Sequence, residues 1–307
     1  MSPAPVLVVG GGHNGLIGAC YLARAGRRVV VLEASDKAGG GSRTDETIPG
    51  HLFNTHSVAH NIINMTRIPS ELDLAGAGLE YIPMELFATG LFRDGRIVRF
   101  HRDIEQTVAS IAEHDRAEAE AYRTFTHKAV PLVTTAVTGL ESGSTPGGVG
   151  RAVADKLWPL LQGIKRSGGP IGLLAPAGRH TVYLACPSAP YDLDGGWESQ
   201  AEAFADTMVE QVEQHAPGFR DSIQARTVRA LPLMAEELRW PGAHPMHLDV
   251  SLDQLAFLRP TRRLAGHTVP GVEGLFTCGA STAPVGGIAG SSGSSGKAAA
   301  LAVLKRS

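Results

Sequence analysis

Apolar positions in the first third of the chain change from continuous runs to helical spacing and back. Residues 6–9 form an apolar run of strand-forming residues, which is typical of a parallel strand covered on both faces. Small and apolar residues then recur at helical spacing over residues 15–24, and Gly26 stands where such a helix would end. A second apolar run follows at residues 28–32. This order predicts a strand, a helix and a second strand parallel to the first.

Strand-like and helix-like patterns continue to mix farther along, which predicts an α/β fold. An Asp-Gly pair between apolar flanks predicts a hairpin over residues 91–100. Residues 103–140 and 196–219 have helical patterns, whereas residues 180–187 resemble a strand. The Gly- and Ser-containing stretch 141–150 is the most obvious linker.

Gly10, Gly12 and Gly15 give the spacing G-x-G-x-x-G between the first predicted strand and the predicted helix. The first glycine makes the tight turn, the second lets the backbone approach a pyrophosphate, and the third lets the helix pack close to the strand. Unpaired N–H groups at the helix N-terminus favour the negative charge of the pyrophosphate. Glu33 ends the second strand, near the position where an acid binds the adenosine ribose and disfavours a 2′-phosphate. The motif predicts a site for FAD or NAD rather than NADP.

A second glycine cluster, GGGSRT at residues 39–44, separates these two cofactors. It resembles the motif that extends the dinucleotide fold in flavoproteins of the amine oxidase and phytoene desaturase superfamily. The resemblance implies that Gly40 and Gly41 pass close to the diphosphate and ribityl of the cofactor, with Arg43 nearby. It therefore implies FAD as the cofactor.

Residues 272–304 resemble the closing FAD motif of the same family, with a strand-like run at 275–278, a turn and a helix of small residues. The resemblance aims the N-terminus of this last helix at the flavin, where a helix dipole stabilises negative charge on the reduced ring. It places four residues of the region at the cofactor: Gly279, Ala280, Gly287 and Ile288. Gly290, Gly293 and Gly296 predict a bare helix face that packs on the first strand–helix unit.

The resemblance covers about residues 5–125 and 176–304, and it is to the pyridine nucleotide-disulfide oxidoreductase domain 2-like branch of the family. Family members are longer, and only residues 141–179 stand where they carry most of the substrate domain. We therefore expect a Rossmann-like FAD-binding domain of the GR2 type, formed by residues 1–100 and 241–307. A reduced substrate or cap region of helices and strands is expected at residues 101–240.

The resemblance implies an oxidoreductase that desaturates or oxidises an apolar small molecule by hydride transfer to flavin N5. Such a reaction needs little acid–base chemistry from the protein, and the sequence does not identify a catalytic residue. His56 and His60 are candidates for a proton acceptor on the substrate side, and we expect no metal site. Oxygen, a quinone and another protein stay open as electron acceptors.

Two other functions stay open at the level of the sequence. A flavin-dependent isomerase or cyclase would use bound FAD without net redox chemistry. A non-catalytic binding protein would need a partner chain. Because the middle segment is short, we expect a homo-oligomer or a partner chain to complete the site and cover the surface left bare.

Charge and cysteine content change this picture little. The chain has 28 basic and 30 acidic side chains, so no charge excess steers it toward nucleic acid. Arg259, Arg262 and Arg263 are expected at the surface, and the 3 cysteines are expected as buried free thiols. Without a leader pattern or a run of roughly 20 apolar residues, the expected location is the cytoplasm, and peripheral membrane contact stays open.

Overall fold

The computed structural model of the chain describes residues 4–57, 60–141, 169–170, 178–186, 188–244, 247–248, 251, 254, 258–283 and 292–306. The expected linker lies outside these residues from position 142 onward. Gly287, Ile288 and Gly290 of the closing motif lie outside them as well.

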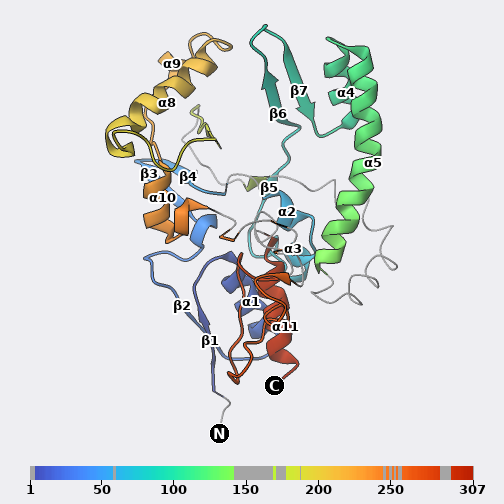
Figure 1. Cartoon of the computed structure of the whole chain (residues 1–307), viewed down its shortest axis with the longest axis vertical. Coiled ribbons are helices and arrows are strands. Elements are labelled where there is room, and N and C mark those ends of the chain that lie inside the picture. The colour runs from blue at the N-terminus through green and yellow to red at the C-terminus, as the bar shows by residue number, and fades with distance from the viewer. Residues whose placement is uncertain are drawn as a thin grey trace.

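The first strand, helix and second strand form as the sequence pattern predicts. β1 (Val6–Val9) pairs in parallel with β2 (Val29–Leu32), and α1 (His13–Arg24) connects them (Figure 1). Gly26 has a φ of 80°, and its N–H donates to the Ala23 carbonyl oxygen at 2.9 Å, which ends the helix. This unit has the Rossmann-like α/β architecture.

The β1–β2 pair is open to solvent, contrary to the expectation from its continuous apolar sequence. Leu7 and Val9 of β1 are 59% and 84% exposed, and Leu32 of β2 is 49% exposed. α1 packs on the pair, mainly against β2, and within the described chain β1 pairs with β2 alone. The apolar run is suited to a strand with two faces to bury, but the described chain leaves much of its surface uncovered.

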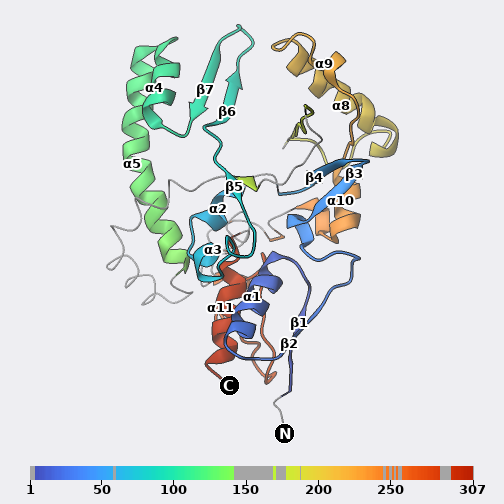
Figure 2. The same cartoon turned by 180° about the vertical axis from the view of Figure 1, so that it is seen from behind.

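The last helix packs along the first. α11 (Ser294–Leu304) lies beside α1 in both views of the molecule (Figures 1 and 2). A Cβ at Gly296 would overlap the carbonyl oxygen of Asn14, and one at Gly293 would overlap the side chain of Ile17. The bare helix face is therefore confirmed at its two described glycines, whose missing side chains permit the close approach.

A carboxylate on α3 (Ile68–Glu71) ties these two helices together. Glu71 accepts hydrogen bonds from Lys297 of α11 at 2.5 Å and from the hydroxyl of Tyr21 of α1. The ammonium of Lys297 also lies 5.5 Å from the centroid of the Tyr21 ring. Burial raises the pKa of Glu71, but the hydrogen bonds from Lys297 and Tyr21 outweigh burial and lower it. The ionised carboxylate thus links α1, α3 and α11.

Short elements follow the second glycine cluster. They are η1 (Gly40–Ser42), β3 (Thr44–Ile48), β4 (His51–Asn54), α2 (Asn61–Asn64) and β5 (Tyr81–Ile82). β3 and β4 form an antiparallel hairpin, and β5 pairs antiparallel with β8 (Gly169–Pro170).

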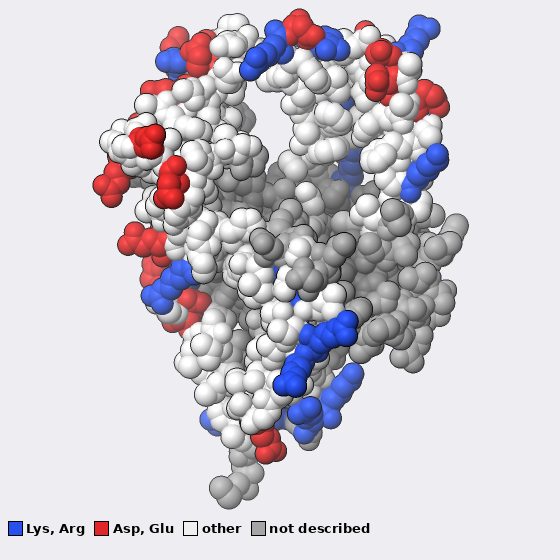
Figure 3. Space-filling model, in the orientation of Figure 1, with Lys and Arg blue, Asp and Glu red and all other residues white. Residues whose placement is uncertain are grey.

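Two arms extend from this region (Figure 1). The first comprises β6 (Leu86–Leu91), β7 (Ile97–His101), α4 (Ile104–Ala112) and α5 (Arg116–Glu141). The second comprises α8 (Trp197–Glu213), α9 (Phe219–Ser222), α10 (Leu231–Leu238) and η3 (Pro241–Ala243). The arms meet where His215 Nε2 lies 3.4 Å from the carbonyl oxygen of Phe92, and the space-filling view shows an opening between them (Figure 3). No helix in the described part of the chain is both long and apolar enough to cross a membrane.

Three expectations for strands and cysteines are wrong. The strand expected at residues 180–187 does not form at residues 180–186, because no described strand lies beside them to take up their backbone hydrogen bonds, and residue 187 lies outside the described residues. In the expected strand 275–278, Phe276 forms only an isolated bridge with Thr268. The cysteines are exposed rather than buried, since their helix and loops turn these positions toward solvent: Cys20, Cys186 and Cys278.

Candidate functional site

Gly10 and Gly12 of the first glycine turn both have open space where a Cβ would lie, but only at Gly12 does the backbone also accept a side chain. Gly10 has a φ of 99°, which side chains disfavour, and a Cβ at Gly15 would overlap the carbonyl oxygen of Gly10. Gly12, in contrast, has φ −68° and ψ 167°, which any residue adopts. Sequence neighbours aside, no described atom lies within 4 Å of a Cβ built at Gly12. The fold therefore needs glycine at positions 10 and 15, whereas Gly12 leaves a cradle that fits a pyrophosphate at the N-terminus of α1.

Glu33 is a fixed anion at the end of β2. Its Oε2 accepts a hydrogen bond from the N–H of Gly11 at 2.6 Å, and its Oε1 accepts one from the N–H of Ser35 at 2.9 Å. Backbone hydrogen bonds from Ser35 and then Gly11 lower the pKa of Glu33 to about 2. The ionised carboxylate lies against the first turn, where it can accept from ribose hydroxyls and would repel a 2′-phosphate.

We expect Glu33→Gln to lower the affinity for FAD, the cofactor predicted from the sequence, by roughly tenfold or more. A hydrogen bond to a charged acceptor contributes about 1.5–3 kcal/mol. A titration of the cofactor-free chain with FAD, followed by flavin fluorescence, measures the change. Asp36→Asn is the matched control, since Asp36 is exposed in the same loop. An unchanged dissociation constant in Glu33→Gln would contradict a role of this carboxylate in binding.

The second glycine turn lies directly against the first. The N–H of Gly39 donates to the carbonyl oxygen of Gly11 at 2.7 Å, and Gly12 and Gly39 form an isolated parallel bridge. Gly40 has a φ of 57°, and a Cβ there would lie 3.1 Å from the Cα of Gly12. The fold thus brings together the residues that two separate motifs assign to the cofactor: Gly10, Gly12, Gly15, Glu33, Gly40, Gly41 and Arg43.

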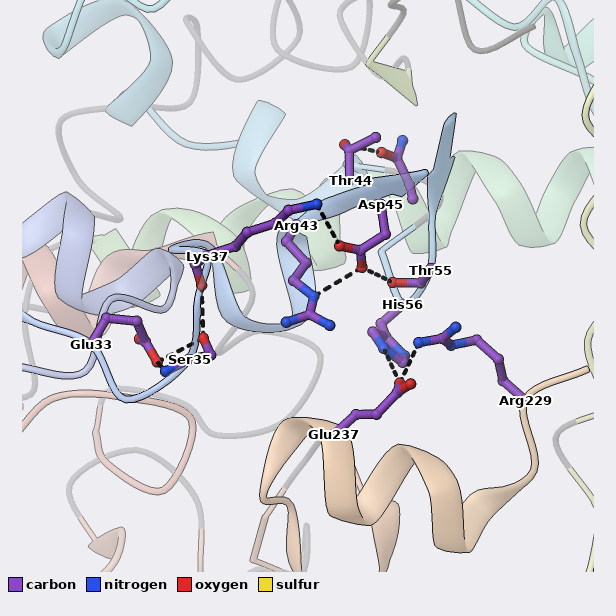
Figure 4. Close-up of polar contacts among 11 residues, drawn as sticks. Glu33, Ser35, Lys37, Arg43, Thr44, Asp45, Thr55, His56, Arg229 and Glu237 are labelled. Carbon is purple, nitrogen blue, oxygen red and sulfur yellow. Dashed lines mark hydrogen bonds and ion pairs between the residues drawn. The ribbon is translucent and has the colours of Figure 1, made fainter. Parts of the chain in front are cut away.

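Arg43 leaves the second turn and is held by Asp45 of β3. Its Nε donates to Asp45 Oδ2 at 2.9 Å, and the hydroxyl of Thr55 donates to the same oxygen at 3.2 Å (Figure 4). Lys37 Nζ lies 3.3 Å from Asp45 Oδ1. Burial raises the pKa of Asp45, but the hydrogen bonds from Arg43 and Lys37 outweigh burial and lower it. Asp45 therefore stays ionised and fixes the guanidinium beside the turn.

A further polar cluster, formed by His56, Glu237 and Arg229 and called the His56 cluster below, lies next to the second turn. His56 Nε2 is 3.9 Å from Glu237 Oε2, and Arg229 Nη2 contacts the same oxygen (Figure 4). A Cβ built at Gly41 would lie 3.9 Å from the Cβ of His56 and 2.7 Å from the ring of Trp240. Gly41 is therefore also needed for packing. No sequence motif marks Glu237, Arg229 and Trp240, because only the fold brings α10 and the residues on either side of it to this turn.

His56 is buried and neutral at pH 7. Its side chain is 1% exposed, and neither ring nitrogen has a hydrogen-bond partner in the described chain. Burial and then the Arg229 guanidinium lower the pKa of His56 to about 4. His60, the other candidate, has its Nδ1 3.4 Å from the hydroxyl of Tyr81, and burial lowers its pKa as well. Among the described side chains, no three His, Cys, Asp or Glu residues converge as metal ligands do.

The free energy of unfolding should decrease as the pH drops from 7 to about 4, and protonation of His56 should cause part of this decrease. The pKa of His56 is about 4 in the folded chain and about 6.5 in an unfolded chain, so the unfolded chain binds the proton first. The stability that neutral His56 contributes is present above pH 6.5, and roughly 2–3 kcal/mol of it is lost as the pH falls to about 4. The charged groups with the largest effects on the pKa of His56 are Arg229, Glu237, Arg43 and Asp45.

Urea unfolding at a series of pH values checks this expectation. His56→Gln is the comparison, because glutamine does not titrate and other groups contribute equally to both chains. The unfolding free energy of the wild type should decline more steeply between pH 7 and about pH 4. Equal slopes in the two chains would refute the shifted pKa of His56.

The closing motif is tied to the first helix through α11. Gly279 has a φ of 120°, and its N–H donates to the hydroxyl of Ser295 in the first turn of α11 at 3.0 Å. The hydroxyl of Thr282 lies 2.5 Å from the same Ser295 oxygen. Gly279 and Ala280 thus join the unit that carries the first glycine turn, since α11 packs on α1. The other two residues assigned to the cofactor, Gly287 and Ile288, lie outside the described residues.

Arg259 is buried rather than at the surface as the sequence suggested. It is 0% exposed, and its guanidinium donates to the carbonyl oxygens of Ala280, Gln254 and Leu248 at 3.1, 3.3 and 3.2 Å. Burial lowers the pKa of the guanidinium. Because every residue carries a backbone carbonyl, the sequence does not show which carbonyl oxygens surround Arg259 and cannot predict that this side chain is buried. Arg259 positions the turn at Ala280.

The parallel strands, the glycine turn at a helix N-terminus and the acid after β2 define a dinucleotide-binding α/β protein. Residues 8–68 match the family described as NAD(P)-binding Rossmann-like domain. Pyridine nucleotide-disulfide oxidoreductase domain-containing protein 2 of Mus musculus is 39% identical to this chain over 118 residues. One subunit of the limonene dehydrogenase of Castellaniella defragrans is 37% identical over 118 residues, and hydroxyneurosporene desaturase of Cereibacter sphaeroides is 31% identical over 126 residues.

These matches confirm the resemblance seen in the sequence. The chain carries a Rossmann-like domain and fits the superfamily of FAD-dependent desaturases and amine oxidases. The three matches cover 38%, 38% and 39% of this chain but only 20%, 21% and 25% of the respective relatives. The chain thus matches a fifth to a quarter of the length of these relatives, whose names support an oxidoreductase of the flavin type in general.

Proposed function

We propose that this chain is an FAD-dependent oxidoreductase that oxidises or desaturates an apolar small molecule. The observation that carries the proposal is the cradle at Gly12, against which the second glycine turn is packed. Relatives named a limonene dehydrogenase and a hydroxyneurosporene desaturase support dehydrogenation as the class of reaction.

Bound FAD would supply an acceptor for two electrons, with N5 taking a hydride. In this proposal the chain binds and orients the cofactor with both of its motifs. Gly12 and the N-terminus of α1 hold the pyrophosphate, Glu33 accepts from the ribose hydroxyls, and the turn from Gly40 to Arg43 runs along the diphosphate and ribityl. The cofactor domain comprises residues 1–100 and 241–307, and residues 101–240 form the substrate region.

His56 is the proton acceptor in this proposal. Its ring is neutral at pH 7, because burial lowers its pKa, and it lies beside the second glycine turn. A neutral imidazole can take the proton that leaves a substrate during dehydrogenation. His60 is less suited to this role, since its Nδ1 faces the hydroxyl of Tyr81.

A second copy of this chain or a partner chain completes the cofactor domain in this proposal. The support is the exposure of apolar residues on the β1–β2 pair, because stable monomers rarely leave large apolar patches in water. Light scattering during size-exclusion chromatography of the purified chain measures the assembly. A monodisperse monomer that binds FAD would contradict this part of the proposal.

The visible absorption spectrum of the purified chain tests the proposed function. We expect flavin bands, and release of FAD, identified by its mass, when the chain is denatured. A colourless chain that FAD cannot reconstitute would overturn the proposal and favour a non-catalytic binding protein.

A further inference from the structure

Three buried polar atoms of the His56 cluster have no hydrogen-bond partner in the described chain. They are His56 Nδ1, His56 Nε2 and Arg229 Nε. The side chains that carry them meet at one oxygen, Glu237 Oε2 (Figure 4). Buried polar groups nearly always have a partner, supplied by protein, by water or by a ligand. The concentration of such atoms in one cluster therefore indicates a shared polar partner, which water or a polar group of a ligand can supply.

The donors and acceptors of the cluster restrict the chemistry of that group. A neutral imidazole has one donating and one accepting nitrogen, and Arg229 Nε only donates. Because Glu237 faces His56 Nε2, the proton is favoured on Nε2 and Nδ1 is left as the acceptor. A group that donates to Nδ1 and accepts from Arg229 must both give and take a hydrogen bond. A hydroxyl does so, whereas a carbonyl only accepts.

The charges around His56 do not favour an anion. The charged groups with the largest effects on the pKa of His56 are the cations Arg229 and Arg43 and the anions Glu237 and Asp45. Among these four groups the positive and negative charges are equal in number, so they give a carboxylate or phosphate no excess of positive charge to offset its desolvation. A neutral hydroxyl avoids this cost.

Aromatic rings next to the cluster suit the apolar remainder of such a molecule. The ring centroid of Trp240 lies 6.2 Å from that of His56 and 5.5 Å from that of His247. The same indole packs on Gly41 of the second glycine turn. A molecule bound by the His56 cluster would therefore lie beside the proposed cofactor site.

We propose that the His56 cluster binds the hydroxyl group of an otherwise apolar substrate. The hydroxyl donates to His56 Nδ1 and accepts from Arg229 Nε, while Glu237 is a positioning residue that holds the guanidinium and faces His56 Nε2. That the bound alcohol is the substrate rests on the proposed function. The class of substrate is then an alcohol.

Binding is tested by NMR on the full chain labelled with ¹⁵N-histidine, titrated with 2-octanol and, separately, with 1-octene. We expect 2-octanol to shift the ring nitrogens of His56 in a saturable manner and 1-octene to leave them unchanged. His56→Gln assigns the resonances by their loss. Glu237→Gln should weaken the response to 2-octanol roughly tenfold, and Glu236→Gln is the matched control, because Glu236 is exposed on the same helix.

Either of two results would overturn the proposal. Equal shifts with both compounds would mean that the hydroxyl is not recognised. No shift at the solubility limit of 2-octanol would mean that water alone partners these atoms. The titration is run with and without FAD, so a chain that binds 2-octanol but cannot be reconstituted with FAD contradicts only the proposed function.

Discussion

Gly12→Ala is expected to lower the affinity for FAD roughly 100-fold, which corresponds to about 2.7 kcal/mol. The added methyl group would occupy the cradle that the pyrophosphate needs, although it meets no described protein atom other than sequence neighbours within 4 Å. The stability of the cofactor-free chain should change by less than about 1 kcal/mol, because a poorer helix cap is offset by a less flexible unfolded chain. Binding and folding are thus separated at this position.

Isothermal titration with FAD and urea unfolding of the cofactor-free chain measure the two effects. Gly266→Ala is the control for the substitution itself, because no described atom beyond sequence neighbours lies within 4 Å of a Cβ there either. Its FAD affinity should equal that of the wild type. If Gly12→Ala also binds FAD normally, the first glycine turn is not the pyrophosphate site.

Gly296→Ala is expected to lower the free energy of unfolding by about 3 kcal/mol. Its Cβ would overlap the carbonyl oxygen of Asn14, which belongs to the backbone of α1 and cannot rotate away. The carbonyl oxygen of Gly296 already lies 3.1 Å from a Cβ built at Gly18, so the two helices have no spare distance there. Relief requires that α11 move away from α1 and give up part of its packing.

Urea unfolding compares Gly296→Ala with Gly12→Ala, which should stay close to the wild type. The two variants are expected to differ in stability, because packing requires glycine at position 296 whereas FAD binding requires it at position 12. Equal stability of Gly296→Ala and the wild type would show that the α1–α11 interface tolerates a side chain.

Local patterns in the sequence predict the elements that local physics determines. The apolar runs and the glycine spacing correctly give β1, α1 and β2, and an Asp-Gly pair correctly marks the β6–β7 turn. The helical pattern over residues 103–140 appears as α4 and α5, with a break between them, and that over residues 196–219 begins as α8. In each case the residues that decide the conformation are neighbours in the sequence.

Features that depend on distant contacts could not be predicted. The sequence favours His56 as a candidate but cannot supply Glu237, because α10 reaches the site only through the fold. The burial of Arg259 depends on backbone carbonyls, which every residue carries. Residues 180–186 of the expected strand 180–187 stay irregular for a related reason, since a strand needs a neighbour that the sequence does not specify.

The packing of α11 on α1 also sets a delay during synthesis. Residues 25–293 must be added after α1 is complete and before α11 begins. At roughly 5–20 residues per second, this takes about 13–54 s. Throughout that interval the face of α1 with Ile17 and Gly18 lacks its partner helix and is accessible to other unfolded chains. A chaperone that protects this face during synthesis would therefore have to stay bound for about 13–54 s.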